Sequence, residues 1–211
     1  MSILEEISTF MQRGRSPKVK ELVQQALDEG ISPQEILEQG LLSGMNVVGV
    51  KFKNNEVFVP EVLIAARAMN AGIEVLKPAL LADGVEAKGK VVIGTVKGDL
   101  HDIGKNLVRM MIEGQGITVV DLGVDVSPEQ FYEAAVAEKA QVVCCSALLT
   151  TTMGEMKNVV KIFEEKGIRD QVKIMVGGAP ITQGFCESIG ADCYAADAAT
   201  AAEAALALCQ N

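Results

Sequence analysis

The stretch "VVIGTVKGDLHDIGKN", residues 91–106, joins a short apolar run to a polar loop that holds the only histidine of the 211-residue chain. An apolar run without polar alternation is typical of a parallel strand that is covered on both faces. Further runs of this kind follow, separated by helix-like segments, at 117–123, 141–147, 172–178 and 192–195. The alternation predicts an α/β fold with a five-stranded parallel sheet, flavodoxin-like or Rossmann-like, and helices on both sides.

The N-terminal part of the chain has a helical pattern instead. Its apolar residues recur at three- and four-residue spacing, and alternating segments are missing. Ser16 and Ser32 each precede a proline, so each is predicted to be a helix N-cap with proline at the first helical position. Glu35 would then complete a capping box with Ser32. These signals predict a bundle of four helices.

The change of pattern predicts two domains. Residues 83–89, "DGVEAKG", are polar and contain glycine, which is typical of a linker. We therefore expect a helical-bundle cap domain over residues 1–85 and an α/β domain over residues 90–211.

Composition and charge exclude several classes of partner. The formal net charge is −9, from 28 acidic and 19 basic residues, and no cluster of Lys and Arg is interleaved with aromatic residues. Such a chain would be repelled by nucleic acid. The N-terminus "MSILEEISTF" lacks the pattern of a secretion signal, and no run approaches the ~20 apolar residues of a membrane span. The sequence predicts a cytoplasmic protein without a nucleic-acid or membrane partner.

The five cysteines are expected to be reduced and mostly buried. Their number is odd, and they form no Cys-x-x-Cys pair. Cys144 and Cys145 lie in the third predicted strand, so their side chains should point to opposite faces of the sheet.

In an open parallel sheet, ligands bind beyond the C-terminal ends of the strands. The loops that follow the first, third and fourth predicted strands there are "KGDLHDIGKN" (97–106), "SALLTTT" (146–152) and "GGAP" (177–180). A nucleotide site would need a glycine motif that these loops lack. A zinc site needs more ligands than one histidine, a triad led by Ser146 lacks the nucleophile elbow, and a phosphoacceptor site lacks its acidic cluster.

His101 could by itself be an ordinary packed or surface residue. However, Asp99 lies two residues before it, on a loop where such sheets bind ligands. An exposed imidazole backed by a carboxylate is a good single ligand for a metal that brings its other donors with it. A metal held in a macrocycle meets that description.

The three loops together resemble a known motif. Asp99-x-His101-x-x-Gly104, then 41 residues, Ser146-x-Leu148, then 28 residues and Gly177-Gly178 resemble the corrinoid-binding motif of methionine synthase and of the corrinoid proteins of anaerobic methyltransferase systems. The stretch "GMNVVGVKFKNNEVFVPEVLIAARAM" (44–69) is similar to the cap domain of that family. The resemblance covers nearly the whole chain.

The resemblance implies roles for individual residues. His101 would be the lower axial ligand of cobalt, Asp99 would accept the other imidazole N–H, and Thr152 would complete a proton relay in which methionine synthase has serine. The remaining residues expected at the cobalamin or related corrinoid are, in the histidine loop, Asp102, Ile103 and Gly104; along the nucleotide-tail channel, Ser146, Leu148, Thr150, Gly177, Gly178 and, with Ala199, Ala198; and in the cap, Phe52, Val59 and Val62. The three cap residues could instead be ordinary helix core.

The resemblance also implies a function. The chain would shuttle a methyl group between a substrate-specific methyltransferase and a second methyltransferase that acts on tetrahydrofolate or a thiol, and a reductive activator would be a further partner. It would be non-catalytic alone. A cobalamin-dependent sensor or regulator, the small subunit of a mutase and a corrinoid storage protein are the alternatives. Methanol, methylamines and methoxyaromatics are all donors of such systems.

Overall fold

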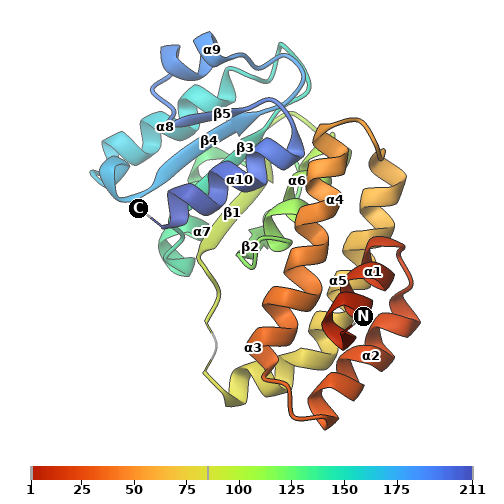
Figure 1. Cartoon of the computed structure of the whole chain (residues 1–211). Helices are drawn as coiled ribbons and strands as arrows, with labels where there is room; N and C mark the ends of the chain where they lie inside the picture. Colours follow the sequence, from red (N-terminus) through yellow and green to blue (C-terminus); the bar gives the residue numbers. More distant parts are fainter. Residues whose placement is uncertain (1, 85, 211) are drawn as a thin grey trace. The chain divides into compact units, whose positions relative to one another are not determined.

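The computed structural model describes residues 2–84 and 86–210. The chain divides into two compact units, Met1–Glu86 and Ala87–Asn211. The first is helical and the second is built on a sheet (Figure 1).

The helical unit contains four helical segments within its described residues. They are α1 (Ile3–Gln12), α2 (Ser16–Asp28), the uninterrupted run of α3 (Pro33–Glu35), the π-helix η1 (Ile36–Leu42) and α4 (Ser43–Lys53), and α5 (Val59–Ala82). In α1 the buried residues Leu4, Ile7 and Met11 recur at three- and four-residue spacing, so one stripe of the helix faces the core. The predicted helical bundle is confirmed.

The two predicted N-caps have different outcomes. The Ser32 side chain accepts a hydrogen bond from the Glu35 backbone N–H at 3.2 Å, as an N-cap should. The prediction for Ser16 is wrong, because α2 begins at Ser16 itself and Arg15 is the N-cap. Gly14 has a φ of +68°, a left-handed turn after which the chain enters the helix one residue earlier than expected.

The second unit contains a five-stranded parallel sheet, as predicted. Its strands are β1 (Lys90–Thr95), β2 (Thr118–Asp121), β3 (Val142–Ser146), β4 (Lys173–Gly177) and β5 (Cys193–Ala195). The order across the sheet is β2-β1-β3-β4-β5 (Figure 1), which is the flavodoxin-like order. The strands β2 to β5 each lie within the corresponding apolar run of the sequence, and β1 begins one residue before its run.

Helices cover both faces of this sheet. They are α6 (Ile103–Glu113), α7 (Pro128–Glu138), α8 (Glu155–Glu165), α9 (Gln183–Ser188) and α10 (Ala198–Cys209), with a 3-10 turn η2 (Arg169–Gln171) before β4. The helices α6 and α10 pack against each other, and α7 packs against α8. One hydrophobic core lies between the sheet and α7, α8 and α9. The helices α6 and α10 cover the opposite face.

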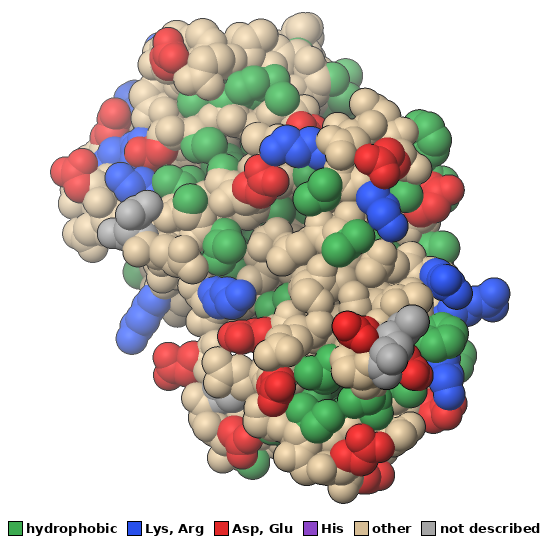
Figure 2. Space-filling model, viewed as in Figure 1, with side chains coloured by type: hydrophobic (Ala, Val, Ile, Leu, Met, Phe, Trp, Pro, Cys, Tyr) green, Lys and Arg blue, Asp and Glu red, His purple; other side chains and the backbone are tan. Residues whose placement is uncertain are grey.

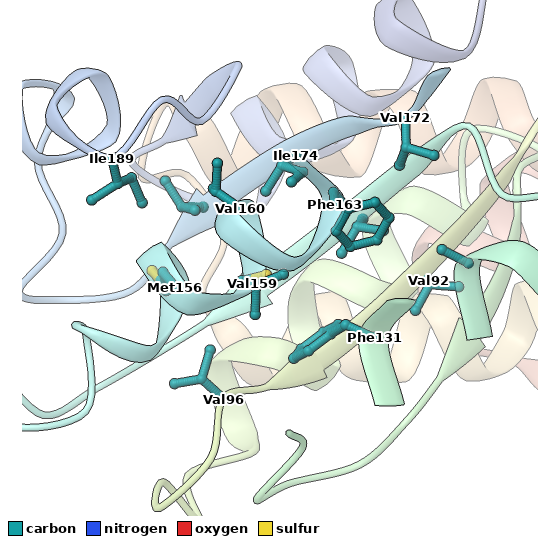
Figure 3. Close-up of a cluster of buried hydrophobic side chains, with 14 of the residues drawn as sticks. Val92, Val96, Phe131, Met156, Val159, Val160, Phe163, Val172, Ile174 and Ile189 are labelled. Atoms are coloured by element: carbon teal, nitrogen blue, oxygen red, sulfur yellow. The ribbon is translucent and has the colours of Figure 1, made fainter. Parts of the chain in front are cut away.

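The core under α7 and α8 shows why β1 contains a glycine. Figure 3 shows Phe131 and Phe163 in this core, with Val92 of β1 and Val96, which directly follows β1, nearby. A Cβ atom at Gly94 would lie 2.8 Å from the Cζ atom of Phe131, so only glycine lets the ring pack this close to the strand.

All five cysteines are free thiols, as predicted. Cys144 and Cys145 are buried on opposite faces of the sheet: Cys145 belongs to the core under α7 and α8, and Cys144 faces the side of α6 and α10. Burial raises the pKa of both thiols, which therefore stay protonated near neutral pH.

The surface carries both signs of charge. Figure 2 shows Lys and Arg side chains interspersed with Asp and Glu over the face in view. Among the described residues, no helix has the length and the apolar composition needed to cross a bilayer.

Candidate functional site

The neighbouring strands β1 and β3 mark the place where the strand order reverses. From β1 the chain crosses to β2, on one side, and from β3 it crosses to β4, on the other. The loops after these two strands therefore diverge and leave a crevice at the C-terminal edge of the sheet. The predicted residues Asp99, His101, Leu148 and Thr152 all lie in these two loops.

Asp99 is fully buried between the two loops. Its Oδ1 atom lies 2.8 Å from the Nδ1 atom of His101 and accepts the His101 backbone N–H at 3.1 Å. Its Oδ2 atom accepts hydrogen bonds from the backbone N–H groups of Leu148 (2.8 Å) and Leu149 (3.2 Å) and from the Thr152 hydroxyl (2.8 Å). One carboxylate thus joins the loop after β1 to the loop after β3.

These contacts keep Asp99 ionised. Burial by itself raises the pKa of the carboxyl group, but the hydrogen bonds from Leu148, His101 and Thr152 stabilise the charged form and outweigh burial. The pKa of Asp99 is therefore well below its usual value. The unfolded chain lacks these bonds, so their contribution to stability is complete above the ordinary aspartate pKa near ~3.9 and is lost as the pH falls through the folded-state pKa.

The contact with Asp99 determines the tautomer of His101. An ionised carboxylate can only accept a hydrogen bond, so Nδ1 carries the proton and Nε2 keeps its lone pair. The histidine side chain is 51% exposed, which leaves Nε2 on the side away from the buried aspartate. His101 therefore presents one nitrogen donor to the outside of the sheet edge.

Exposed apolar side chains lie in the same two loops and at the start of α6. Leu100 and Ile103, which flank the histidine in sequence, are 71% and 77% exposed. Leu148 and Leu149, whose N–H groups bind Asp99, are also exposed. Exposed apolar side chains gathered in this way are typical of a site that a large apolar ligand covers. Among the described residues, His, Cys, Asp and Glu form no group of three or more that could hold a metal ion, so His101 is a single donor.

An ion pair of a buried lysine anchors the helix that follows His101. Lys105 in the first turns of α6 is 2% exposed, and its Nζ atom lies 2.6 Å from both carboxylate oxygens of Asp121 at the end of β2. Burial raises the pKa of Asp121, but the bonds from Lys105 and the Gly123 N–H outweigh this and lower it. Sequence reasoning missed this pair. The available signal was a lysine on the apolar face of a predicted helix.

A cavity of about 370 Å³ lies between the sheet and the helices α6 and α10. Five predicted residues line it: Gly104, Ser146, Gly177, Gly178 and Ala198. Sequence reasoning missed its apolar lining, which includes Ile93, Leu107, Val108, Cys144, Met175 and Ala201. Its volume lies within the range of small-molecule and cofactor sites.

Two of the glycines at this cavity, Gly178 and Gly104, are explained by different physical reasons. Gly178 has a φ of +132°, and a Cβ atom there would lie 1.8 Å from the Ala147 carbonyl oxygen, so the protein's own backbone requires glycine. At Gly104 a Cβ atom would meet no atom within 4 Å. Gly104 therefore keeps open a space that the fold itself does not need.

The other predicted residues do not line the cavity. Asp102, Ile103, Leu148 and Thr150 are exposed, so Leu148 and Thr150, which were expected along the tail channel, lie outside it. Ala199 is buried beside Ala198. The three predicted cap residues belong to the helical unit. There Phe52 and Val59 are half-buried, and Val62 is fully buried.

Comparison with protein families finds a match in each unit. Residues 89–207 match a family described as the B12 binding domain, and residues 3–77 match a second family with the same description.

Whole proteins are similar over almost the full chain. A dimethylamine corrinoid protein 3 of Methanosarcina acetivorans is 43% identical over 94% of this chain and 93% of its own. A trimethylamine corrinoid protein 1 of the same organism is 48% identical over 82% of both chains. A corrinoid protein of Desulfitobacterium hafniense is 41% identical over 97% of this chain and 96% of its own.

Solved structures agree. A chain of the methanol:cobalamin methyltransferase complex of Methanosarcina barkeri has a TM-score of 0.88 and 33% identity, covering 98% of this chain and 79% of that chain. A cobalamin-binding protein of Desulfitobacterium hafniense has a TM-score of 0.81 and 29% identity, covering 97% and 98%.

Replacement of Asp99 by asparagine should lower the free energy of unfolding by about 2 kcal/mol or more at pH 7, because the amide NH2 group cannot accept the hydrogen bonds that one of the two carboxylate oxygens accepts. Below pH ~4 the wild-type chain should lose this advantage, so the two unfolding curves should converge. Urea unfolding at several pH values measures both effects. Asp170→Asn, an exposed site in the same unit, is the control; equal curves for Asp99→Asn and Asp170→Asn would contradict the prediction.

Substitution of alanine for Gly178 and for Gly104 should affect the free energy of unfolding of the ligand-free chain differently. Gly178→Ala should destabilise it by more than about 4 kcal/mol or prevent folding, because the new methyl group meets a backbone oxygen. Gly104→Ala should leave the unfolding free energy unchanged or raise it by up to about 1 kcal/mol, since the site is helical and open. Urea unfolding compares them, and similar losses in both variants would show that the Gly104 side is not open.

Proposed function

The chain belongs to the family of proteins that contain the B12 binding domain, and on this premise we propose that it binds a corrinoid and carries a methyl group between two methyltransferases. The observation that carries the proposal is the contact between His101 and the buried carboxylate of Asp99 at 2.8 Å. Through this contact a single histidine becomes a fixed nitrogen donor at the mouth of a parallel sheet.

The residues present fit such a cofactor. His101 would ligate the cobalt through Nε2, and Asp99 would hold the proton on Nδ1, which strengthens the imidazole as a donor. The exposed side chains of Leu100, Ile103 and Leu148 would offer apolar surface to the macrocycle. The cavity beside α6 and α10 would take the nucleotide tail, and the open space at Gly104 leaves room for it.

When bound, the corrinoid supplies a nucleophilic cobalt that takes up a methyl group and releases it. The chain's own residues provide ligation and electrostatics. Asp99 orients the ring and keeps its tautomer, and Thr152 holds the far oxygen of Asp99 through its hydroxyl. Thr152 is buried, so this hydrogen bond is shielded from water.

Partner enzymes supply the two half-reactions. One structural relative belongs to a methanol:cobalamin methyltransferase complex, and two sequence relatives are named for dimethylamine and trimethylamine. The first partner of this chain would be a substrate-specific methyltransferase of that kind, which would choose the donor. The second would transfer the methyl group to tetrahydrofolate or a thiol, and a reductive activator would restore the cofactor after oxidation.

The ligation can be tested at one atom, because His101 is the only histidine. In the paramagnetic cobalt state of the holo-protein, electron paramagnetic resonance should show splitting from one nitrogen nucleus. Growth with ¹⁵N-histidine should change this splitting from a three-line to a two-line pattern, and His101→Ala should abolish it. Asp170→Asn should leave it intact. A pattern that is insensitive to the label would place another group on the cobalt and refute the proposal.

The carrier function can be tested by methyl transfer. The full chain loaded with labelled methylcobalamin should keep its label when it is alone, because the proposal assigns activation of the acceptor to the partner enzyme. With a cognate acceptor methyltransferase and its acceptor, label should leave at least about tenfold faster than from free methylcobalamin, since docking orients the reacting groups. The measurement is label in the acceptor over time. Equal rates from the chain and from free methylcobalamin would count against a carrier role.

A further inference from the structure

The cavity beside α6 and α10 changes character along its length. At its mouth lie Ser146 and Gly177, which are register partners at the C-terminal ends of β3 and β4. Two residues earlier in the same strands lie the partners Cys144 and Met175. Because side chains alternate between faces, positions 144, 146, 175 and 177 belong to the same face of the sheet, and Cys144 and Met175 lie roughly 6–7 Å further from the mouth.

Residues of α6 and α10 also line the inner end of the cavity. In a parallel α/β unit the helices run opposite to the strands, so later residues of α6 and α10 lie further from the mouth. The inner lining is apolar on all sides. We call it the cavity floor, and it consists of Ile93, Leu107, Val108, Cys144, Met175 and Ala201.

Except at the mouth, the polar side chains that line this cavity already bind other groups of the protein or face away from the cavity. The Nζ atom of Lys105 binds Asp121 and Asn106, and both carboxylate oxygens of Asp197 accept hydrogen bonds from Thr200. Tyr194 packs against the core on the opposite face. Of the described lining residues, Ser146 alone retains a hydroxyl for a ligand, and Ser146 lies at the mouth.

The strongest polar atom of the floor is the thiol of Cys144. This thiol is buried, and burial raises its pKa, so it stays neutral. A neutral thiol is a weak hydrogen-bond donor and a weak acceptor. The strand backbone beside it is paired within the sheet. A ring buried on this floor would therefore find little to replace the hydrogen bonds that it made with water.

We propose that the cavity floor makes this chain selective for corrinoids whose nucleotide tail ends in an apolar base, of the benzimidazole or phenol type, over corrinoids whose tail ends in adenine. The inference rests on the proposed corrinoid binding and adds the class of cofactor to it. The floor discriminates between the bases because it offers a polar base few hydrogen-bond partners.

The physical reason is desolvation. A benzimidazole that is released from cobalt keeps one free ring nitrogen, whereas adenine keeps three and an exocyclic amino group as well. Each additional polar atom that is buried without a partner weakens binding. A pocket of this kind binds the more polar ligand about 10-fold to 100-fold more weakly.

The test is a set of dissociation constants for the full ligand-free chain, measured by calorimetry with four corrinoids. Cobalamin carries dimethylbenzimidazole, the second ligand carries a phenolic base, the third carries adenine, and cobinamide lacks the nucleotide tail. We expect cobalamin and the phenolic corrinoid to bind with similar constants and the adenine corrinoid to bind at least about 10-fold more weakly than cobalamin.

Two variants place a hydroxyl in the floor from different elements, Cys144→Ser on β3 and Ala201→Ser on α10. In each variant the dissociation constant of the adenine corrinoid, divided by that of cobalamin, should fall by at least about threefold. The reason is that a hydroxyl group both donates and accepts hydrogen bonds. Cys186→Ser is the matched control, since Cys186 is buried on the opposite face of the sheet. It should leave the ratio unchanged.

The outcomes separate the two proposals. If cobalamin and the adenine corrinoid bind equally well, or if Cys186→Ser narrows the ratio as much as both floor variants do, selectivity by the floor is overturned and corrinoid binding stands. If none of the four ligands binds, cobinamide included, the proposed function falls, and the inference falls with it.

Discussion

The site depends on one buried carboxylate. Asp99 lies in the loop after β1, yet half of its hydrogen-bonding capacity is used by Leu148, Leu149 and Thr152 in the loop after β3. Its other oxygen holds the ring and the backbone of His101. A charge that is fully buried is costly unless such donors surround it. The two loops are therefore held in one arrangement, and the histidine that they orient is fixed with its donor nitrogen outward.

The sheet makes this arrangement possible. The strands β1 and β3 are neighbours, and their connections leave in opposite directions, so the loops diverge at one edge and leave space between them. The helix α6 starts two residues after the histidine and is tied to β2 by the ion pair between the buried Lys105 and Asp121. Because α6 is also a wall of the cavity, the same anchor positions the histidine loop and the pocket beside it. Ligation and tail binding thus share one support.

Much of this organisation could be predicted from local sequence. Buried parallel strands appear as apolar runs without alternation, and each of the five runs overlaps one observed strand. Ser32 and Ser127 act as N-caps where serine precedes proline, because their side chains can reach the N–H groups of the first turn. The same signal failed at Ser16, where the left-handed turn at Gly14 brings the chain into the helix one residue early. The position of an N-cap depends on the backbone conformation of the residues before the helix, and the Ser-Pro motif does not determine that conformation.

The sequence by itself determined the fold class, the division into helical and sheet parts, and the pairing of Asp99 with His101, because these depend on neighbours in the chain. The tertiary structure alone decided what lies across space. The hydrogen bonds from Leu148 and Thr152 to Asp99 span 49 and 53 residues. Glycine is required at position 178 by the carbonyl of Ala147, which directly follows the neighbouring strand β3. The cavity floor combines side chains from three strands and two helices. Strand order and register set these contacts, and both arise from packing the whole sheet, which no single stretch of residues encodes.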